Sequence, residues 1–291
     1  MSIKLKQPYS RRPDYTVQVG RKRFVEKRMF FHGLVPVSLY RRIPELIQVF
    51  ELREERLLNL EVVSPHRPVP RSFYVMDDPS LTSDDRELLS YLVRIWASDD
   101  EAPKRIRNRI ESNLKTLGLA QKFAVVQISK RFGPKVFEIR VSPTIPRHRV
   151  TIADAGFGLS QALPLAAYDA RLTNGFLITY QPEVHLHPFA QSRLADIFTQ
   201  SVSRGNQLFI ETHSPDLILR LQAKIARNEI AAGDVRVFCF ENRQGRSHIT
   251  SVDLSAKGSP VIPWPAGFLD TSLSLARDLA AERVRLNKNV P

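Results

Sequence analysis

The stretch from Asp154 to Pro215 constrains the fold more than any other part of the chain, because it contains three short polar motifs. They are DAGFGLSQ at 154–161, QPEVHLHP at 181–188 and ETHS at 211–214. The second and third motifs each follow an apolar run, at 176–179 and 208–210, and a helical segment at 189–203 lies between them. Such runs are typical of buried parallel strands joined by a crossover helix. The sequence therefore predicts an α/β fold with a mainly parallel sheet and flanking helices.

Polar residues come directly after both predicted strands. In a parallel sheet, the residues just past the carboxyl ends of the strands face the ligand crevice. We therefore expect one edge of the sheet to gather five polar side chains, namely Gln181, Glu183, Glu211, Thr212 and His213.

Size and hydropathy fit a globular protein of one large domain or two modest ones, with 291 residues of which 43% are hydrophobic. No apolar run reaches the roughly 18 residues of a membrane span, and none follows the charged start as in a signal peptide. We therefore expect a cytoplasmic protein without membrane contact. Cys239, the single cysteine, lies in an apolar run, so we expect it in the core, and an intrachain disulfide is excluded.

The formal net charge of +13 points to anionic partners such as nucleic acid or nucleotides. The basic residues are spread over the chain, from Arg11 and Arg12 near the start to the tail at 283–288. Charge of this kind also suits a merely basic, solvated surface. At this point both interpretations stay open.

The rest of the chain alternates between helical and extended patterns. Helices are predicted at 44–55, 83–96, 103–117, 216–229 and from about 271 to 286, and strands at 57–63, 123–129, 135–141, 150–153, 235–240 and 247–254. The loop at 64–74 contains three prolines, which fit neither a helix nor a central strand. We expect Arg67 and Arg71 to project from this loop.

Together, the three central motifs resemble the signature, Walker B and switch-histidine motifs of bacterial ABC-type AAA-family ATPases. The group resembled includes RecF-like and overcoming-lysogenisation-defect-like proteins and their relatives in phage defence. The loop at 64–74 and the sequence PWPAGFLD at 263–270 resemble segments of one subfamily. The resemblance covers residues 60–275 and implies a P-loop NTPase-like ABC ATPase head. It divides the chain into a basic, partly ordered segment at 1–55, the C-terminal part of a head at 56–255, and a short C-terminal module with a helix at 256–291.

In such ATPases two heads enclose ATP, and the signature helix of one head points its N-terminus at the γ-phosphate bound by the other. A helix N-terminus carries a partial positive charge and unpaired N–H groups. The resemblance implies that four residues contact the nucleotide in trans, namely Gly156, Gly158, Ser160 and Gln161. It implies catalytic roles for Gln181, Glu183 and His213, with His213 sensing the γ-phosphate. It also implies phosphate or loop contacts for Arg67, Arg71 and Glu211.

Two departures from the family pattern stand against an active enzyme. A phosphate-binding Walker A loop requires Gly-x-x-x-x-Gly-Lys-Ser/Thr, and the sequence contains no Gly-Lys dipeptide. Where the family has an acidic ligand for Mg²⁺ at the end of the Walker B strand, this chain has Tyr180, so no metal ligand is assigned. The chain therefore resembles the C-terminal part of a head that lacks the phosphate-loop segment, and we do not expect it to hydrolyse ATP on its own.

Two functional hypotheses follow. In the first, the chain is a degenerate ATPase head that uses ATP and Mg²⁺ in a homodimer, or in a heterodimer with a protein containing Walker A. Its dimerisation then serves nucleic-acid transactions or antiviral defence. In the second, it is a non-catalytic pseudo-ATPase that binds a protein partner or DNA, which the replacement at Tyr180 favours.

Two further interpretations are weaker. Glu183, His185 and His187 alternate and could share one face of an extended segment as a metal site. The resemblance instead implies that the two histidines tie the loop to the next helix, with Pro188 in its first turn. A nuclease would need clustered carboxylates, and Asp154, Glu183 and Glu211 are better explained by the ATPase motifs.

Overall fold

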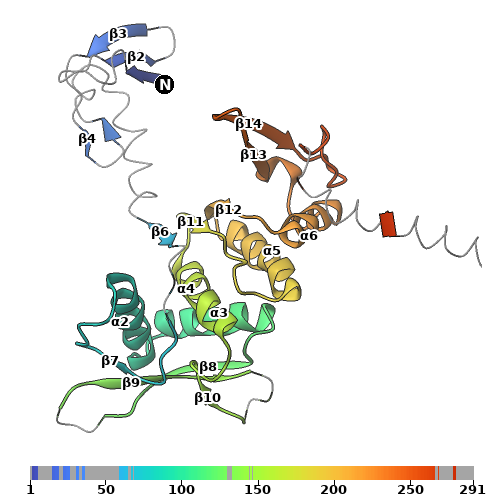
Figure 1. Ribbon diagram of the computed structural model, residues 1–291. Coiled ribbons are helices and arrows are strands. Elements are labelled where there is room, and N and C mark those ends of the chain that lie inside the picture. Colours follow the sequence, from blue (N-terminus) through green and yellow to red (C-terminus); the bar gives the residue numbers. More distant parts are fainter. Residues whose placement is uncertain are drawn as a thin grey trace, which may run out of the picture. The chain divides into compact units, whose positions relative to one another are not determined.

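The computed structural model (Figure 1) describes residues 2–5, 15–19, 22–26, 31–32, 35–36, 59–265, 268 and 278–279, with gaps at 65–66, 68, 130–132, 144 and 146. The chain divides into a unit from Met1 to Leu60 and a unit from Glu61 to Pro291. The helices predicted at 44–55 and from about 271 to 286 lie outside the described residues, apart from two residues of the second. In the first unit, β1 (Ser2–Leu5), β2 (Tyr15–Val19) and β3 (Lys22–Glu26) form an antiparallel sheet, and β4 (Phe31–His32) pairs with β5 (Val35–Pro36).

The second unit holds the central motifs. Its strands are β6 (Leu60–Val63), β7 (Tyr74–Val75), β8 (Lys122–Gln127), β9 (Val136–Ser142), β10 (Val150–Thr151), β11 (Phe176–Tyr180), β12 (Gln207–Glu211), β13 (Arg236–Arg243) and β14 (Arg246–Asp253). Its helices are α2 (Ser83–Ala97), α3 (Glu101–Thr116), α4 (Phe157–Arg171), α5 (Pro188–Ser203) and α6 (Pro215–Ala226), with a short 3-10 helix at Ala232–Asp234. None of the described helices has the length and apolar character that crossing a membrane requires.

The predicted parallel strands are present and adjacent. Strands β11 and β12 pair in parallel with Tyr180 opposite Glu211, and β6 adjoins β11 on its other side. Helix α5 connects the two parallel strands and packs against α6 (Figure 1). The α/β class with a parallel sheet and flanking helices is thus confirmed. The shared ends of β11 and β12 place the motifs at 181–188 and 211–214 side by side.

The starts of α5 and α6 follow from their sequences. The Nδ1 atom of His187 accepts a hydrogen bond of 3.3 Å from the backbone N–H of Phe189, and Pro188 occupies the first turn, as predicted. The hydroxyl of Ser214 likewise accepts a hydrogen bond of 3.3 Å from the N–H of Leu217. Both helices therefore begin immediately after the motifs, which fixes where the motif loops end.

A second, antiparallel sheet is more extensive than the sequence predicts. The hairpin of β8 and β9 was expected, but β9 also pairs with β10 and with β7. The loop predicted at 64–74 therefore ends in a strand, because Tyr74 lies opposite Phe137. Strands β13 and β14 form a separate hairpin, as predicted, and Cys239 is buried in it.

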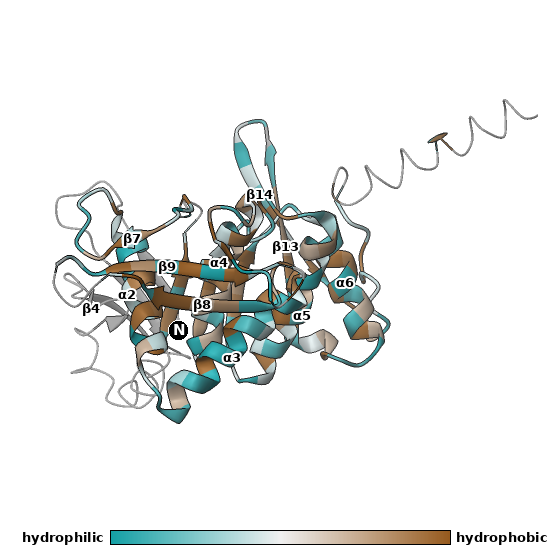
Figure 2. Cartoon of the chain, turned by 90° about the horizontal axis from the view of Figure 1, so that it is seen from below, coloured by the Kyte–Doolittle hydropathy of each residue, from teal (hydrophilic) through white to brown (hydrophobic). Residues whose placement is uncertain are grey.

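Helix α4 is the centre of the core. Every residue from Leu159 to Ala170 is buried, which its Ala- and Leu-rich sequence allows without exposing apolar surface. It packs against α3, whose hydrophobic and hydrophilic residues lie on different faces (Figure 2). Pro164 lies inside α4 and cannot donate the helical hydrogen bond to the carbonyl of Ser160.

Candidate functional site

The carboxyl ends of β11 and β12 bring the predicted polar residues together. The backbone N–H of Gln181 donates a hydrogen bond of 2.7 Å to the carbonyl of Glu211. Gln181 adopts a φ of 44°, in the left-handed region that is unusual for a residue other than glycine. The chain therefore turns sharply after β11, which directs Glu183 back toward the loop after β12. The side chain of Glu211 is exposed at this edge.

Glu183 binds the loop that contains His213. Only 7% of its surface is exposed, and its Oε1 accepts a hydrogen bond of 2.6 Å from the backbone N–H of His213. Its Oε2 is buried and has no hydrogen-bond partner among the described residues. His213 itself is exposed. The carboxylate thus anchors the backbone of His213 and leaves the imidazole accessible.

Arg67 lies at the junction of two motifs. Its Nη1 donates to the carbonyl of Gln161, and its Nη2 donates to the carbonyls of Tyr180 and Gln181, all at 3.0 Å. Burial lowers the pKa of Arg67, and the opposite charge of Glu183 counteracts this effect. The proline-rich sequence of the loop predicts that Arg67 projects from it. The structure instead turns it inward, and no local sequence signal predicts this direction.

The glycine turn before α4 faces the loop after β11. Gly156 is exposed, adopts a φ of 95° and provides no side chain to cap the helix. The ring of Phe157 meets the ring of His185 edge to face, with 4.9 Å between centroids. A Cβ atom on Gly158 would lie 2.8 Å from the carbonyl oxygen of His185. Glycine at 158 is therefore required for this close approach, and the exposed N-terminus of α4 lies beside the loop that carries Glu183.

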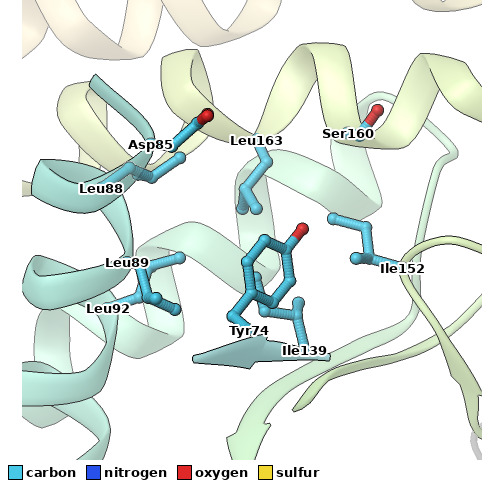
Figure 3. A pocket seen from close by; sticks show the side chains of 9 residues that line it. All are labelled: Tyr74, Asp85, Leu88, Leu89, Leu92, Ile139, Ile152, Ser160 and Leu163. Carbon is cyan, nitrogen blue, oxygen red and sulfur yellow. The ribbon is translucent and has the colours of Figure 1, made fainter. Parts of the chain in front are cut away.

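Ser160 is directed into the protein. It is 3% exposed, and its hydroxyl donates a hydrogen bond of 2.7 Å to the carbonyl of Phe157. Gln161 is also buried. Ser160, Leu163 and Tyr74 are among the residues that line a cavity of about 20 Å³, and the hydroxyl of Ser160 points away from the ring of Tyr74 (Figure 3). A space of this size holds about one water molecule. It is a packing void, and no nucleotide fits into it.

Arg71 and Tyr180 occupy different surroundings. The Nη1 atom of Arg71 lies 2.9 Å from Asp78 Oδ2 and 3.0 Å from the hydroxyl of Ser80, so its side chain binds the nearby segment that follows β7. The Tyr180 side chain, at the position of the expected acidic ligand, is 38% exposed. The structure therefore places Arg67 in the site and binds Arg71 to residues outside it.

The residues present fit one side of an ATP site. A turn with backbone N–H groups at the exposed start of α4 suits a phosphate group. The phosphate-loop side is not matched, because the sequence has no Gly-Lys dipeptide and has Tyr180 in place of a carboxylate. Among the described residues, no group of three or more His, Cys, Asp or Glu side chains could hold a metal ion.

Three solved structures of Smc heads overlap loosely with the chain. The Smc head domain with an extended coiled coil, bound to the C-terminal domain of ScpA and derived from Pyrococcus furiosus, is 14% identical, with 61% of this chain and 38% of that chain covered and a TM-score of 0.36. The SmcHead bound to the C-winged helix domain of ScpA is also 14% identical, with 62% and 58% covered and a TM-score of 0.40. A structure from work on ATP-driven dimerisation and DNA-stimulated activation of SMC ATPases is 15% identical, with 66% and 97% covered and a TM-score of 0.38.

The chain thus spans less than two thirds of the first two of these structures, and overlaps of this degree carry no argument about function. No curated protein matches the chain. The family model described as AAA ATPase domain matches residues 45–218, which is more than half of the chain. The chain therefore belongs to the AAA ATPase domain family.

Proposed function

We propose that the chain supplies one half of a composite ATPase site and takes the phosphate loop from a partner polypeptide. The observation that carries this proposal is the contact between the exposed N-terminus of α4 and the loops after β11 and β12. Phe157 and Gly158, at the N-terminus of α4, contact His185 in the loop after β11. Glu183, in the same loop, binds the backbone N–H of His213 in the loop after β12. This arrangement supports binding of a phosphate at an edge where the chain has no Gly-Lys dipeptide of its own.

In this proposal the backbone N–H groups at Phe157 and Gly158 bind a phosphate oxygen, helped by the helix dipole. The hydroxyl of Ser160 stabilises the turn and reaches a phosphate only by giving up the carbonyl of Phe157. His213 offers an exposed imidazole to the γ-phosphate, and Gln181 with Glu183 orients this edge. When bound, ATP supplies the transferable phosphoryl group, and Mg²⁺ supplies positive charge that neutralises the phosphate oxygens.

We also propose the finer assignment to the RecF-like and overcoming-lysogenisation-defect-like group, with dimerisation coupled to nucleic-acid transactions or antiviral defence. The order of the three motifs supports the group, and the net charge of +13 supports a polyanionic partner. The three-part division at residues 55 and 255 belongs to the same proposal. A heterodimer is favoured over a homodimer, because a homodimer of a chain without a Walker A loop still has no Walker A loop.

The test is calorimetric titration of ATP with Mg²⁺ into the full-length chain, alone and mixed with a Walker A-containing protein encoded beside it. The expected result is no heat for the chain alone and saturable binding by the mixture that exceeds binding by the partner alone. Equal binding by the mixture and by the partner alone would refute the composite site.

Two matched histidine variants locate the contact. His213→Ala removes the imidazole but keeps the backbone N–H that Glu183 holds, so it is expected to weaken ATP binding by the mixture. His248→Ala is the control, because His248 is an exposed residue on β14 outside the site. Equal effects of both substitutions would exclude a specific role for His213.

The second candidate function is a non-catalytic interaction protein. The exposed Tyr180 in place of a carboxylate favours it, since a phenol does not replace a carboxylate as a ligand of Mg²⁺. This function predicts DNA binding without nucleotide, with an affinity that falls steeply as salt rises. Fluorescence anisotropy with duplex and single-stranded DNA over a range of salt concentrations measures it. DNA binding without nucleotide, together with flat ATP titrations, would establish this alternative over the composite site.

A further inference from the structure

We propose that the partly buried Arg67 and the buried Glu183 act together as opposite charges and couple the signature turn of α4 to the backbone of the switch histidine. Both are positioning residues in this inference, because each acts on the backbone of other residues. The structural coupling concerns the chain without nucleotide. Only its consequence for ATP rests on the proposed function.

The signature side of the coupling depends on Arg67. One nitrogen of its guanidinium binds the carbonyl of Gln161 in α4, and the other binds the two carbonyls at the end of β11, those of Tyr180 and Gln181. A planar guanidinium can satisfy such a set of acceptors with fixed geometry. Arg67 therefore holds the early part of α4 at a set position relative to the end of β11.

The switch side depends on Glu183. Its Oε1 accepts a short hydrogen bond of 2.6 Å from the N–H of His213, and hydrogen bonds to a charged acceptor are shorter than neutral ones. Glu183 comes from the loop after β11, and His213 from the loop after β12. The position of His213 is therefore set by a carboxylate that is itself buried and needs compensation for its charge.

The two sides meet because Arg67 and Glu183 compensate each other. The charge of Glu183 acts on the Arg67 guanidinium in a partly buried place, where attraction is stronger than in water. The buried Nε of Arg67 is a donor without a hydrogen-bond partner among the described residues, and the buried Oε2 of Glu183 is an acceptor without one. One is a donor and the other an acceptor, and in this inference a bridging water connects them.

A consequence follows for a composite ATPase. In the composite site, the N-terminus of α4 and His213 both contact phosphate oxygens of the nucleotide that the partner holds. A link between them lets occupancy at one contact change the position of the other. Such coupling is reciprocal by thermodynamic necessity, so a change on either side must be felt on the other.

The test is backbone amide hydrogen exchange, measured residue by residue by NMR on the isotope-labelled full chain without nucleotide. The variants are Arg67→Met, Arg67→Lys and Glu183→Gln, and the matched control is Arg71→Met, which removes an arginine of the same loop with local contacts only. Circular dichroism establishes that each variant is folded.

Arg67→Met is expected to speed exchange at the His213 amide by about tenfold, although Arg67 does not touch His213, and this corresponds to ~1.4 kcal/mol. Glu183→Gln is expected to speed exchange at both His213 and the first turns of α4. The double variant Arg67→Met/Glu183→Gln is expected to show no further increase in exchange rate at the His213 amide, because the two residues act as a unit. Arg71→Met is expected to leave amide exchange unchanged at His213 and in the first turns of α4.

Arg67→Lys separates charge from geometry. Lysine keeps the counter-charge of Glu183, so His213 is expected to stay protected, but it cannot bind three carbonyls as the guanidinium does, so exchange in α4 is expected to rise. If Arg67→Met folds and leaves His213 as protected as in the wild type, or if Arg71→Met has the same effects, the coupling is refuted. Binding of ATP by the mixture that does not exceed binding by the partner alone would refute the composite ATPase and leave these exchange results standing, so the two failures are distinguishable.

Discussion

The carboxylate of Asp169 near the end of α4 lies 2.8 Å from the guanidinium of Arg204 at the end of α5, and Asp169 has no exposed surface. The other oxygen of the carboxylate accepts a hydrogen bond of 3.0 Å from the side chain of Asn113 in α3. One buried charge therefore connects three helices, which together fix the helix that carries the signature turn.

Asp169→Ala is expected to destabilise the chain by ~3–5 kcal/mol, because it leaves the partly buried guanidinium of Arg204 without its counter-charge and the buried side chain of Asn113 without its acceptor. Urea denaturation of the full chain measures this. The control is Glu101→Ala, which removes an exposed pair with Lys104, and Glu101 is 75% exposed in its side chain. That substitution is expected to cost less than about 1 kcal/mol. Similar denaturation midpoints for both variants would contradict a structural role of Asp169.

Gly158→Ala is expected to destabilise the chain by ~1–3 kcal/mol, because the added Cβ would come within 2.8 Å of the His185 carbonyl and push α4 away from the loop after β11. The matched control is Gly233→Ala, where an added Cβ has nothing within 4 Å. Thermal unfolding compares the two variants. A Gly158→Ala protein as stable as Gly233→Ala would show that the close approach is not required.

The raised pKa values of Tyr91 and Tyr168 predict that the folded chain loses stability in alkali. Burial is the main cause that raises the pKa of each phenol from 10.0 to about 12. Because the folded pKa exceeds the unfolded one, the contribution is complete below pH ~10 and is lost as the pH rises toward ~12, at ~2 kcal/mol for each residue. Unfolding by urea at a series of alkaline pH values, with phenolate absorbance followed in parallel, measures it.

Tyr91→Phe is the informative variant for this prediction. The Tyr91 hydroxyl is buried without a hydrogen-bond partner among the described residues, so its removal is expected to be neutral or stabilising at neutral pH. It is also expected to reduce the alkaline loss by about half, since Tyr168 remains. An unchanged alkaline profile would show that Tyr91 does not contribute.

Asp196 predicts a loss of stability in acid. Burial is the largest single influence and raises its pKa, but hydrogen bonds from Arg220, Lys224 and Arg193 together lower the pKa below its ordinary 3.8. The contribution is therefore present above pH ~4 and is lost as the pH falls through the lowered value. Acid unfolding of wild type and Asp196→Asn measures it. The variant is expected to be less stable at neutral pH and to show a flatter acid profile, and a profile as steep as that of the wild type would contradict the assignment.

The sequence predicted the parts of the fold that depend on local pattern. The apolar runs before Gln181 and Thr212 are the paired strands β11 and β12, and Pro188 starts α5, because hydropathy and helix-start chemistry act over a few residues. The polar residues at the strand ends also meet, since parallel strands share one edge. Pairing of β9 with both β7 and β10 was not predicted, because two-residue strands are too short to show an alternating pattern.

The direction of Arg67 could not be predicted for a different reason. Its partners lie 94 to 114 positions away along the chain and are backbone carbonyls, which every residue has. No residue type at those positions therefore marks the contact. The burial of Ser160 depends on which side of α4 faces the core, and an Ala- and Leu-rich helix that is buried all round has no hydropathy pattern to show it.

Pro164 lets the two ends of α4 move independently of each other. Since proline has no N–H to bind the carbonyl of Ser160, the first turn can tilt without breaking a helical hydrogen bond at that point. A pull on the glycine turn is then absorbed as a local bend before Pro164, and the buried part of the helix from Leu165 to Ala170 stays largely at rest. A force on the first turn of α4 is transmitted through Arg67, which donates to the carbonyl of Gln161, more readily than along the helix axis.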